Sequence, residues 1–169
     1  MQEKILLVDK NDNPIGYEAK LKTHEDALLH RAFSIFIFND KNEMLIQRRA
    51  IEKYHCGGLW TNTCCSHQRE NEILHEAANR RLKEEMGFST QLFELFTFHY
   101  NVKFENGLTE NEIDHVYIGN YDGNIKLNPN EACDYKWINH DELKEWISTH
   151  PNDFTPWFLI AIKKMKEYR

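Results

Sequence analysis

The sequence lacks any long hydrophobic run, and its mean hydropathy is −0.70. A helix that crosses a bilayer needs about 20 consecutive apolar residues, so a membrane-spanning helix is excluded. The start of the chain does not read as a signal peptide, because Lys4 is followed by only four apolar residues before Asp9. We therefore expect a cytoplasmic protein with no membrane partner.

Positive charge is also scarce. The 21 Lys and Arg residues stand against 27 Asp and Glu residues, which gives a formal net charge of −6. Because nucleic acids attract basic surfaces, this balance argues against nonspecific nucleic-acid binding. At first sight the same balance also disfavours an anionic substrate.

Cysteine is present at only four positions, and no two of them form a CxxC pair. Without an export signal, we interpret Cys56, Cys64, Cys65 and Cys133 as reduced thiols. The simplest role for any one of them is that of a small buried apolar residue.

The chain has no internal repeat, low-complexity tract or linker. Its 169 residues are 41% hydrophobic and 12% aromatic, which is enough apolar material for one folded domain. We predict a single domain over residues 1–169, with its core at about residues 30–148.

Alternating or uniformly apolar segments predict a sheet. The segment AFSIFIF at Ala32–Phe38 is almost entirely apolar, so it should be a central strand covered on both faces, with Glu43–Arg49 as its hairpin partner. The other predicted strands are Glu3–Asp9, Ile15–Lys20, Leu92–Tyr100, Ile113–Tyr121 and Tyr135–Ile138, and Leu59–Cys65 should be extended.

One dominant helix is predicted at Asn71–Met86, where apolar residues fall at helical spacing and Gly87 supplies a stop. Two shorter helices should follow near the C-terminus, at Asp141–Ile147 behind an Asn139/Glu142 capping pair and from an N-cap at Thr155 toward Tyr168. The segment Thr23–Leu29 should be a loop or short turn. The pattern predicts an α/β (α+β) fold with a mixed sheet.

The sequence NTCCSH at residues 62–67 places a thiol near an imidazole. If the segment is extended, Thr63, Cys65 and His67 share a face and Cys64 points away. The alternative is a buried cysteine beside a surface histidine.

A second polar segment, TENEID, places Glu110 and Glu112 two residues apart, so they too share a face if extended. Two such carboxylates repel each other unless a cation or a proton lies between them, although a solvated edge is the simpler alternative. Together with His24, His30 and His67 they form a donor set that suits an octahedral divalent metal such as Mn²⁺ or Zn²⁺.

Other charged residues suggest sites for a hard cation and for an anion. Glu84 and Glu85 lie near the end of the dominant helix, where carboxylates could hold Mg²⁺ on phosphate oxygens. Basic residues at a strand end and in the loop after it would suit phosphate, although surface solubility is their default role. These residues are Lys20, Lys22, Arg48, Arg49 and Lys53.

These motifs resemble those of the type 1 isopentenyl-diphosphate isomerases, which have the Nudix fold. The resemblance extends over essentially the whole chain, and NTCCSH and ENE are its most specific parts. It rests on Leu28–Phe38, Arg48–His67, Arg80–Gly87, Glu110–His115 and Thr155–Phe158.

The Nudix box is only partly matched. Glu72, Arg80, Glu84 and Glu85 agree with the pattern, but Ser66 stands for its first glycine and Arg81 replaces a glutamate. The loss of one hydrolytic carboxylate weakens a hydrolase interpretation. The resemblance implies a mixed sheet sandwiched by helices.

The resemblance also implies roles for individual residues. A Mn²⁺, Zn²⁺ or Mg²⁺ ion would be bound by His24, His30, His67, Glu110 and Glu112. A second ion, Mg²⁺ bridging the diphosphate, would be bound by Glu85 and the backbone carbonyl of Cys65. The diphosphate would be contacted by Lys20, Arg49, Lys53 and Arg81, with Lys22 as an alternative to Lys20. Tyr100 and Trp157 would line the substrate pocket.

The implied reaction moves a double bond between isopentenyl and dimethylallyl diphosphate. We expect Glu112, with Tyr100 nearby, to protonate the alkene, and the Cys65 thiolate to remove a proton from the opposite face; the two roles could be exchanged. Trp157 would stabilise the carbocation through its ring or, alternatively, anchor the last helix.

Two rivals remain: a Nudix diphosphohydrolase of a nucleoside diphosphate derivative and a Nudix-fold module that binds a ligand or stores metal. For the isomerase we expect a monomer or weak homodimer. Bound cations would turn the acidic residues into an anion-binding site, so the net charge no longer disfavours a diphosphate.

Overall fold

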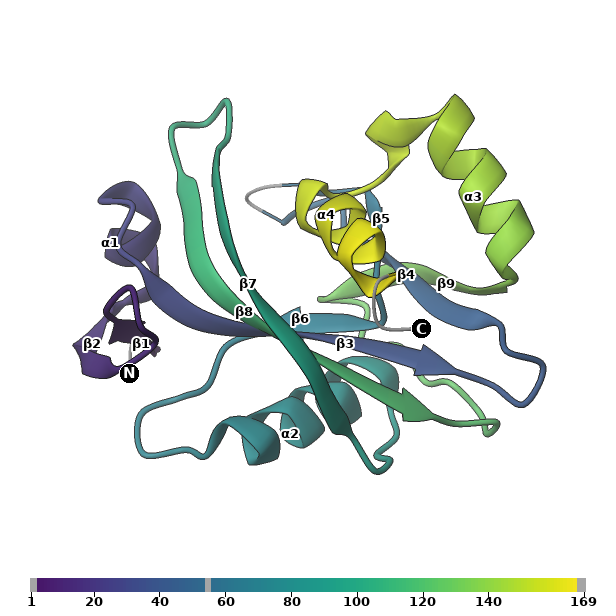
Figure 1. Cartoon of the computed structure of the whole chain (residues 1–169), viewed down its shortest axis with the longest axis horizontal. Coiled ribbons are helices and arrows are strands. Elements are labelled where there is room, and N and C mark those ends of the chain that lie inside the picture. The colour runs from purple at the N-terminus through teal and green to yellow at the C-terminus, as the bar shows by residue number, and fades with distance from the viewer. Residues whose placement is uncertain (1–2, 54–55, 167–169) are drawn as a thin grey trace.

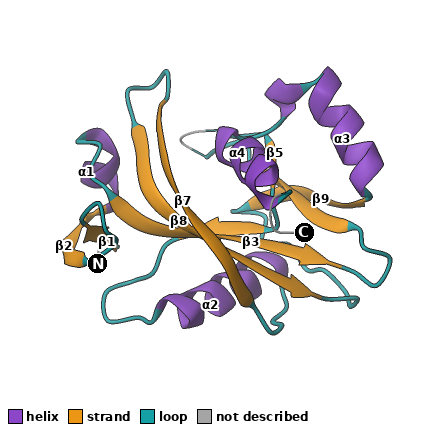
Figure 2. Cartoon of the chain, viewed as in Figure 1, coloured by secondary structure: helices purple, strands orange, loops and turns teal. Residues whose placement is uncertain are grey.

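The computed structural model describes residues 3–53 and 56–166. One mixed sheet forms the body of the molecule, with helices on both of its faces (Figure 1, Figure 2). The strands are β1 (Lys4–Val8), β2 (Pro14–Ala19), β3 (His30–Phe38), β4 (Met44–Arg49), β5 (Trp60–Thr61), β6 (Cys64–Ser66), β7 (Phe93–Lys103), β8 (Thr109–Asn120) and β9 (Ala132–Ile138). The helices are α1 (Lys20–Glu25), α2 (Leu74–Met86), α3 (His140–Thr149) and α4 (Pro156–Met165), with a 3-10 turn at Pro151–Asp153.

Strand β3 is the centre of the sheet, as its apolar sequence predicts. It pairs antiparallel with β1, β4 and β6 and parallel with β8. The parallel ladder runs from His30 beside Glu112 to Phe38 beside Asn120. Strand β3 therefore brings the cysteine-containing segment and the glutamate-containing segment to its two sides.

Each face of β3 packs into its own apolar cluster. Phe33, Ile35 and Ile37 pack with the buried face of α2, which includes Leu82. Phe36 and Phe38 point the other way and pack with α4. Figure 1 shows α2 on one side of the sheet and α4 on the other. The predicted α/β (α+β) fold, with a mixed sheet between helices, is confirmed.

Most predicted elements are present with shifted ends. The dominant helix begins at Leu74 rather than Asn71, because Asn71 has a φ of 66°, which is not helical. It ends at Gly87, whose φ of 81° is left-handed and whose missing Cβ would lie 2.7 Å from the Lys126 Cβ. The cap of α3 is confirmed, since the Asn139 side chain accepts a hydrogen bond from the Glu142 amide at 2.8 Å.

One local prediction is wrong in part. The segment predicted as a loop from Thr23 begins inside helix α1, which is stabilised because the Thr23 hydroxyl donates to the Ala19 carbonyl at 2.8 Å. Thr155 is the N-cap residue of α4 and Pro156 follows it, as predicted, but its hydroxyl is hydrogen-bonded to Thr61 at 2.9 Å and does not cap the helix. The described part of the last helix ends at Met165, and Tyr168 lies outside the described residues.

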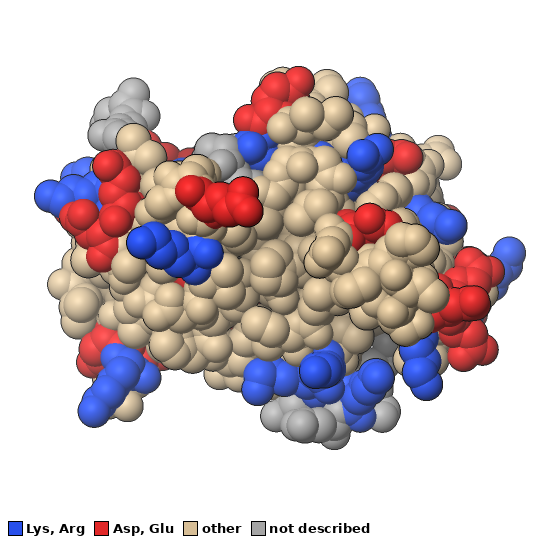
Figure 3. Space-filling model, turned by 90° about the horizontal axis from the view of Figure 1, so that it is seen from above, with Lys and Arg blue, Asp and Glu red and all other residues tan. Residues whose placement is uncertain are grey.

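Among the described residues, no helix combines the length and apolarity needed to cross a membrane. Figure 3 shows that one face of the molecule has uncharged residues in its middle, surrounded by charged side chains of both signs. On that face, therefore, the acidic excess does not form a single patch.

Candidate active site

A pocket lies where the N-terminal half of β3 meets β6, β8 and α2. The predicted site residues come together there from segments far apart in the sequence. Those that line it are Lys20, His24, Arg49, Lys53, Cys65, His67, Arg81, Glu85, Glu110, Glu112 and Trp157. His30 does not line the pocket, and neither does Tyr100, in contrast to its expected lining role; each is a cross-strand neighbour of Glu112, which does.

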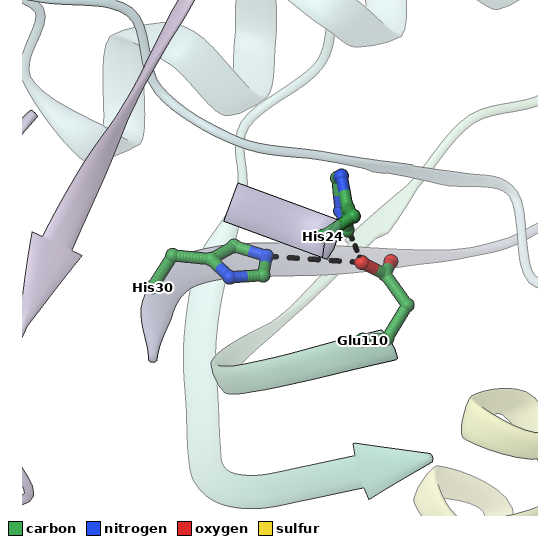
Figure 4. Close-up of side chains that lie close together, drawn as sticks. All are labelled: His24, His30 and Glu110. Atoms are coloured by element: carbon green, nitrogen blue, oxygen red, sulfur yellow. Dashed lines mark ion pairs between the residues drawn. The ribbon is translucent and has the colours of Figure 1, made fainter. Parts of the chain in front are cut away.

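A group of histidine and glutamate side chains occupies one end of the pocket. His24 from α1, His30 from β3 and Glu110 from β8 place ligand atoms within 4.8 Å of one another. Figure 4 shows both imidazoles directed at the Glu110 carboxylate. The His24 Nε2 is paired with Glu110, and the His30 Nε2 lies 3.4 Å from a carboxylate oxygen of Glu112.

The backbone selects the ring nitrogens that face this group. The His24 Nδ1 donates to the Lys20 carbonyl at 2.8 Å, and the His30 Nδ1 donates to the Leu28 carbonyl at 3.0 Å. In the neutral ring, Nε2 then presents a lone pair to the carboxylates. Converging lone pairs repel unless a cation lies among them, and backbone-oriented imidazoles with carboxylates are ligands of divalent metals. The residues therefore fit a metal ion.

His67 lies in the same pocket but outside this tight group. Burial, followed by the charge of Lys20, lowers the pKa of His67 well below its usual value, so the ring is neutral. Its Nδ1 is buried and has no hydrogen-bond partner within the part of the chain that the structure describes. His67 therefore lies outside the group that the other two histidines form with Glu110, and its Nδ1 is 3.7 Å from a carboxylate oxygen of Glu3.

The cysteine-containing segment is less regular than an extended strand. Cys64 points into the apolar cluster beneath α2, while Cys65 and His67 face the pocket, as predicted. Thr63 does not join them: its hydroxyl donates to the Leu45 carbonyl at 2.6 Å. In this part of the chain, the regular strands are β5 and β6. Residues 62–63 between them interrupt the strand alternation, so the Thr63 side chain faces the sheet and not the pocket.

The Cys65 sulfur is surrounded by hydrogen-bonding groups. It donates to the Asn62 side-chain oxygen at 3.0 Å and accepts from the Trp157 indole at 3.2 Å. The Ser34 hydroxyl lies 3.6 Å from the sulfur and donates to a carboxylate oxygen of Asp114 at 2.7 Å. The thiol is therefore fixed on several sides.

Burial dominates the acid–base properties of the two candidate catalytic groups. It raises the pKa of Glu112 well above its usual value, and the charge of Glu110 adds to this effect. Burial, followed by the charge of Asp114, raises the pKa of Cys65 to about 12. Burial therefore favours the protonated form of both groups, so the thiolate expected from the sequence needs the added positive charge of bound cations.

The other end of the pocket is basic, and carboxylates neutralise part of it. Glu131 forms ion pairs with Lys53 and with Arg81, the latter at 3.2 Å. Arg81 also pairs with Glu85 at 2.6 Å. Burial lowers the pKa of Lys20 most, and the charge of Lys53 adds a repulsion between cations at this end. An anion would relieve that repulsion.

Glu85 lies deep at this end of the pocket. It is 4% exposed, and one carboxylate oxygen accepts from the Gln47 side chain at 3.1 Å. Glu85 and Glu131 both line the pocket, so carboxylate oxygens are available to a hard cation next to the basic residues.

Aromatic rings close the pocket behind Cys65. The Arg49 guanidinium lies 5.2 Å from the Trp157 ring centroid. Tyr100 packs edge-on against Trp157 with centroids 6.2 Å apart, and it is the direct cross-strand neighbour of Glu112. Trp157 also belongs to the apolar cluster that holds α4, so its two suggested roles are compatible.

Sequence reasoning missed several residues at the site. Asp114 continues the alternation of Glu110 and Glu112 along β8, so the same period-two argument could have found it. Asn62 opens the NTCCSH segment, and its polarity amid buried residues was a weaker signal. Ser34 lies within an apolar run and Glu131 within a loop, and neither position has a signal in a single sequence.

The chain is similar to known proteins in sequence and in fold. A family model described as the NUDIX domain matches residues 28–158. A protein of Aromatoleum aromaticum named isopentenyl-diphosphate Delta-isomerase 2 is 46% identical over 165 residues, which cover 98% of this chain and 87% of the relative. One of the same name from Photorhabdus laumondii is 49% identical, covering 94% of this chain and 89% of the relative.

Solved structures agree on the fold. A Deinococcus radiodurans protein superposes with a TM-score of 0.72 at 20% identity, covering 88% of this chain and 90% of the other. A MutT NUDIX hydrolase of Burkholderia pseudomallei gives 0.64 at 20% identity, covering 80% and 96%. At this identity the likeness concerns the fold alone.

Proposed function

The chain belongs to the NUDIX domain family and to the isopentenyl-diphosphate Delta-isomerases, and from this membership we propose how its residues perform the reaction. It is an isomerase that interconverts isopentenyl diphosphate and dimethylallyl diphosphate. One observation carries the assignment of residues: the Cys65 and Glu112 side chains line one pocket, between a basic end and a histidine group.

The substrate is a small diphosphate, and its charged part belongs at the basic end of the pocket. Lys20, Arg49, Lys53 and Arg81 would contact its oxygens. Glu131 holds Lys53 and Arg81 in the absence of substrate, which preserves their position near each other. With the diphosphate there, the five-carbon chain extends toward Cys65 and Trp157.

The chemistry needs an acid and a base on opposite sides of the alkene. Glu112 donates a proton to the terminal methylene and produces a tertiary carbocation. Burial raises the pKa of this carboxyl and so opposes the acidifying effect of the metal ion that it would help to bind. The Cys65 thiolate then removes a proton from the neighbouring carbon, so one proton enters and one leaves. In the reverse direction the two residues exchange roles.

The aromatic groups protect the cation between the two proton transfers. The Trp157 ring offers a π face, worth about 2 kcal/mol to a cation that has been removed from water. Tyr100 is 1% exposed beside Glu112 and helps to exclude water, which would otherwise trap the carbocation.

Two metal ions complete the proposal. A Mn²⁺, Zn²⁺ or Mg²⁺ ion would be bound by His24, His30, His67, Glu110 and Glu112, and a Mg²⁺ ion by Glu85 and the Cys65 carbonyl. When bound, they supply positive charge that lowers the pKa of nearby acids and neutralises the diphosphate.

Hydrolysis of a nucleoside diphosphate derivative is the less favoured function. Arg81 takes the place of a carboxylate in the Nudix box, and its guanidinium pairs with Glu85. We also propose a cytoplasmic location, a monomer or weak homodimer, and no nucleic-acid or membrane partner. The domain limits at residues 1–169, with the core at about 30–148, remain a prediction.

The decisive experiment is incubation of the purified protein with isopentenyl diphosphate, followed by detection of dimethylallyl diphosphate and of released phosphate. We expect the allylic isomer and no phosphate. Chelation should abolish turnover, because the carboxylates would lose the cations that balance them, and added Mg²⁺ with Mn²⁺ or Zn²⁺ should restore it. Phosphate release without isomer would support hydrolysis, and turnover in metal-free protein would overturn the metal sites.

A further inference from the structure

Asn62 is a fully buried polar residue whose side chain contacts the Cys65 thiol. Its side-chain nitrogen donates to the Ile35 carbonyl at 3.1 Å and to the Cys64 carbonyl at 3.0 Å. Its oxygen accepts from the Thr61 hydroxyl at 2.8 Å and from the Cys65 thiol at 3.0 Å. Both donors and both acceptor positions of the amide are thus used, so its orientation is fixed.

The hydrogen bonds continue from Asn62 to helix α4 in one direction. The Thr61 hydroxyl gives its only proton to Asn62, so the Thr155 hydroxyl, 2.9 Å away, must donate to Thr61. The Thr155 backbone amide also donates to the Trp60 carbonyl at 3.0 Å. Both threonines are buried, at 0% and 2% exposure, so water does not compete for these bonds. This explains why Thr155 leaves its own helix uncapped.

The chain of bonds closes on the sulfur. Trp157 lies two residues after Thr155, and its indole donates to the Cys65 sulfur at 3.2 Å. Starting at the sulfur, the path runs through Asn62, Thr61 and Thr155 and returns along the backbone to Trp157. Cys65 is therefore held between a loop and the start of α4, and each is fixed to the other.

We propose that Asn62 is a positioning residue that orients the Cys65 sulfur for proton transfer, with Thr61 and Thr155 fixing Asn62 relative to Trp157. The inference rests on the proposed function. A cysteine side chain has three staggered rotamers, and only an orientation toward the substrate carbon allows transfer. The basic end of the pocket uses other residues, so loss of this network should lower kcat and leave KM unchanged.

The test compares variants that differ by single groups. Asn62→Ala should lower kcat about 100-fold, the effect expected of a reacting group displaced by about 1 Å. Thr155→Val removes the hydroxyl at nearly constant shape and should lower kcat about tenfold with KM within about twofold, whereas Thr155→Ser should retain wild-type kcat. Thr90→Val is the matched control, because the Thr90 hydroxyl bonds the Asn120 carbonyl at the far end of β8.

A second readout does not depend on turnover. The rate of Cys65 alkylation by iodoacetamide, followed at the peptide level by mass spectrometry, should change at least about threefold in Asn62→Ala, because the sulfur loses a hydrogen-bond partner that fixes its rotamer. Wild-type kcat in both Asn62→Ala and Thr155→Val, or a Thr155→Ser variant as impaired as Thr155→Val, would overturn the positioning role. Unchanged alkylation would also overturn it. A wild-type protein that alters no isopentenyl diphosphate would instead overturn the proposed function.

Discussion

The two faces of strand β3 are built from one apolar run but differ in chemistry. The odd-numbered residues Phe33, Ile35 and Ile37 enter a cluster under α2 whose buried members are apolar. The even-numbered face carries the polar residues His30 and Ser34 on either side of the small Ala32, and large apolar side chains begin only at Phe36. One strand thus has a face that stabilises the fold and a face that supplies half of a reactive site.

The difference shows where buried polarity is tolerated. On the even-numbered face, Ser34 is bonded to Asp114 and His30 to a backbone carbonyl, so burial costs less than for unpaired groups. The pKa values of Glu112 and Asp114 are nevertheless raised, first by burial, which indicates that this face is electrostatically unfavourable as it stands. The α2 face has no such requirement, so a change on one face should not act like a change on the other.

The largest contrast should come from the two adjacent cysteines, which point to opposite faces of β6. Cys65→Ala should lower turnover at least about 10³-fold, because a proton-transfer group is lost. Cys64→Ala should retain turnover within about threefold and lower the free energy of unfolding by about 1 kcal/mol through a small cavity. Steady-state kinetics and urea unfolding of both variants measure this. An active Cys65→Ala protein would contradict the assignment of the base.

A large effect on stability alone is expected from the other face. Leu82 is 0% exposed in the cluster under α2, so Leu82→Ala should lower the free energy of unfolding by about 2–5 kcal/mol. Turnover by the folded protein should stay near the wild-type value, because no pocket residue changes. Urea denaturation and kcat at low temperature measure the two quantities. If Leu82→Ala had wild-type stability but little turnover, the proposed difference between the two faces of β3 would be wrong.

A smaller, pH-dependent effect should come from Asp114→Asn. Burial, followed by the charge of Glu112, raises the pKa of Asp114, so the folded protein keeps a proton that the unfolded chain loses above about pH 4. Wild-type stability should therefore decrease as pH rises above that value, by up to about 1.4 kcal/mol per pH unit, and the variant should lack this part of the slope.

Urea unfolding at pH 5, 6 and 7 would test the Asp114 prediction, with Asp134→Asn as a control at an exposed carboxyl. The advantage of Asp114→Asn over the wild type should grow with pH, while Asp134→Asn should show no such trend. A variant whose stability parallels the wild type at all three pH values would mean that Asp114 is ionised in the folded protein.

Local patterns in the sequence predicted most of the fold. The apolar run of β3, the helical spacing before Gly87 and the Asn139 cap each express a short-range rule, and each element is present. The ends of elements were less predictable. Helix α2 starts late because Asn71 adopts a left-handed conformation, and α1 forms where side chains bond the backbone four residues earlier.

The site was predictable where its residues lie in motifs. Glu110 and Glu112 share a face of β8, and Cys65 faces the pocket while Cys64 does not. The partners that fix these groups were not predictable, because they come from strand pairing. Ser34 lies beside Cys65 through the β3–β6 register, and the link from Thr155 to Thr61 joins segments that no local pattern connects.

The parallel pairing of β3 with β8 has a further consequence for how the protein acquires its site. His30 lies opposite Glu112 only after the intervening chain, which contains β4 to β7 and α2, has brought the two strands together. Contacts between residues so far apart in the sequence slow folding. A partly folded chain therefore contains the motifs without the pocket. Because a ligand of the pocket recognises only the fully paired sheet, its binding energy adds to the stability of the entire domain.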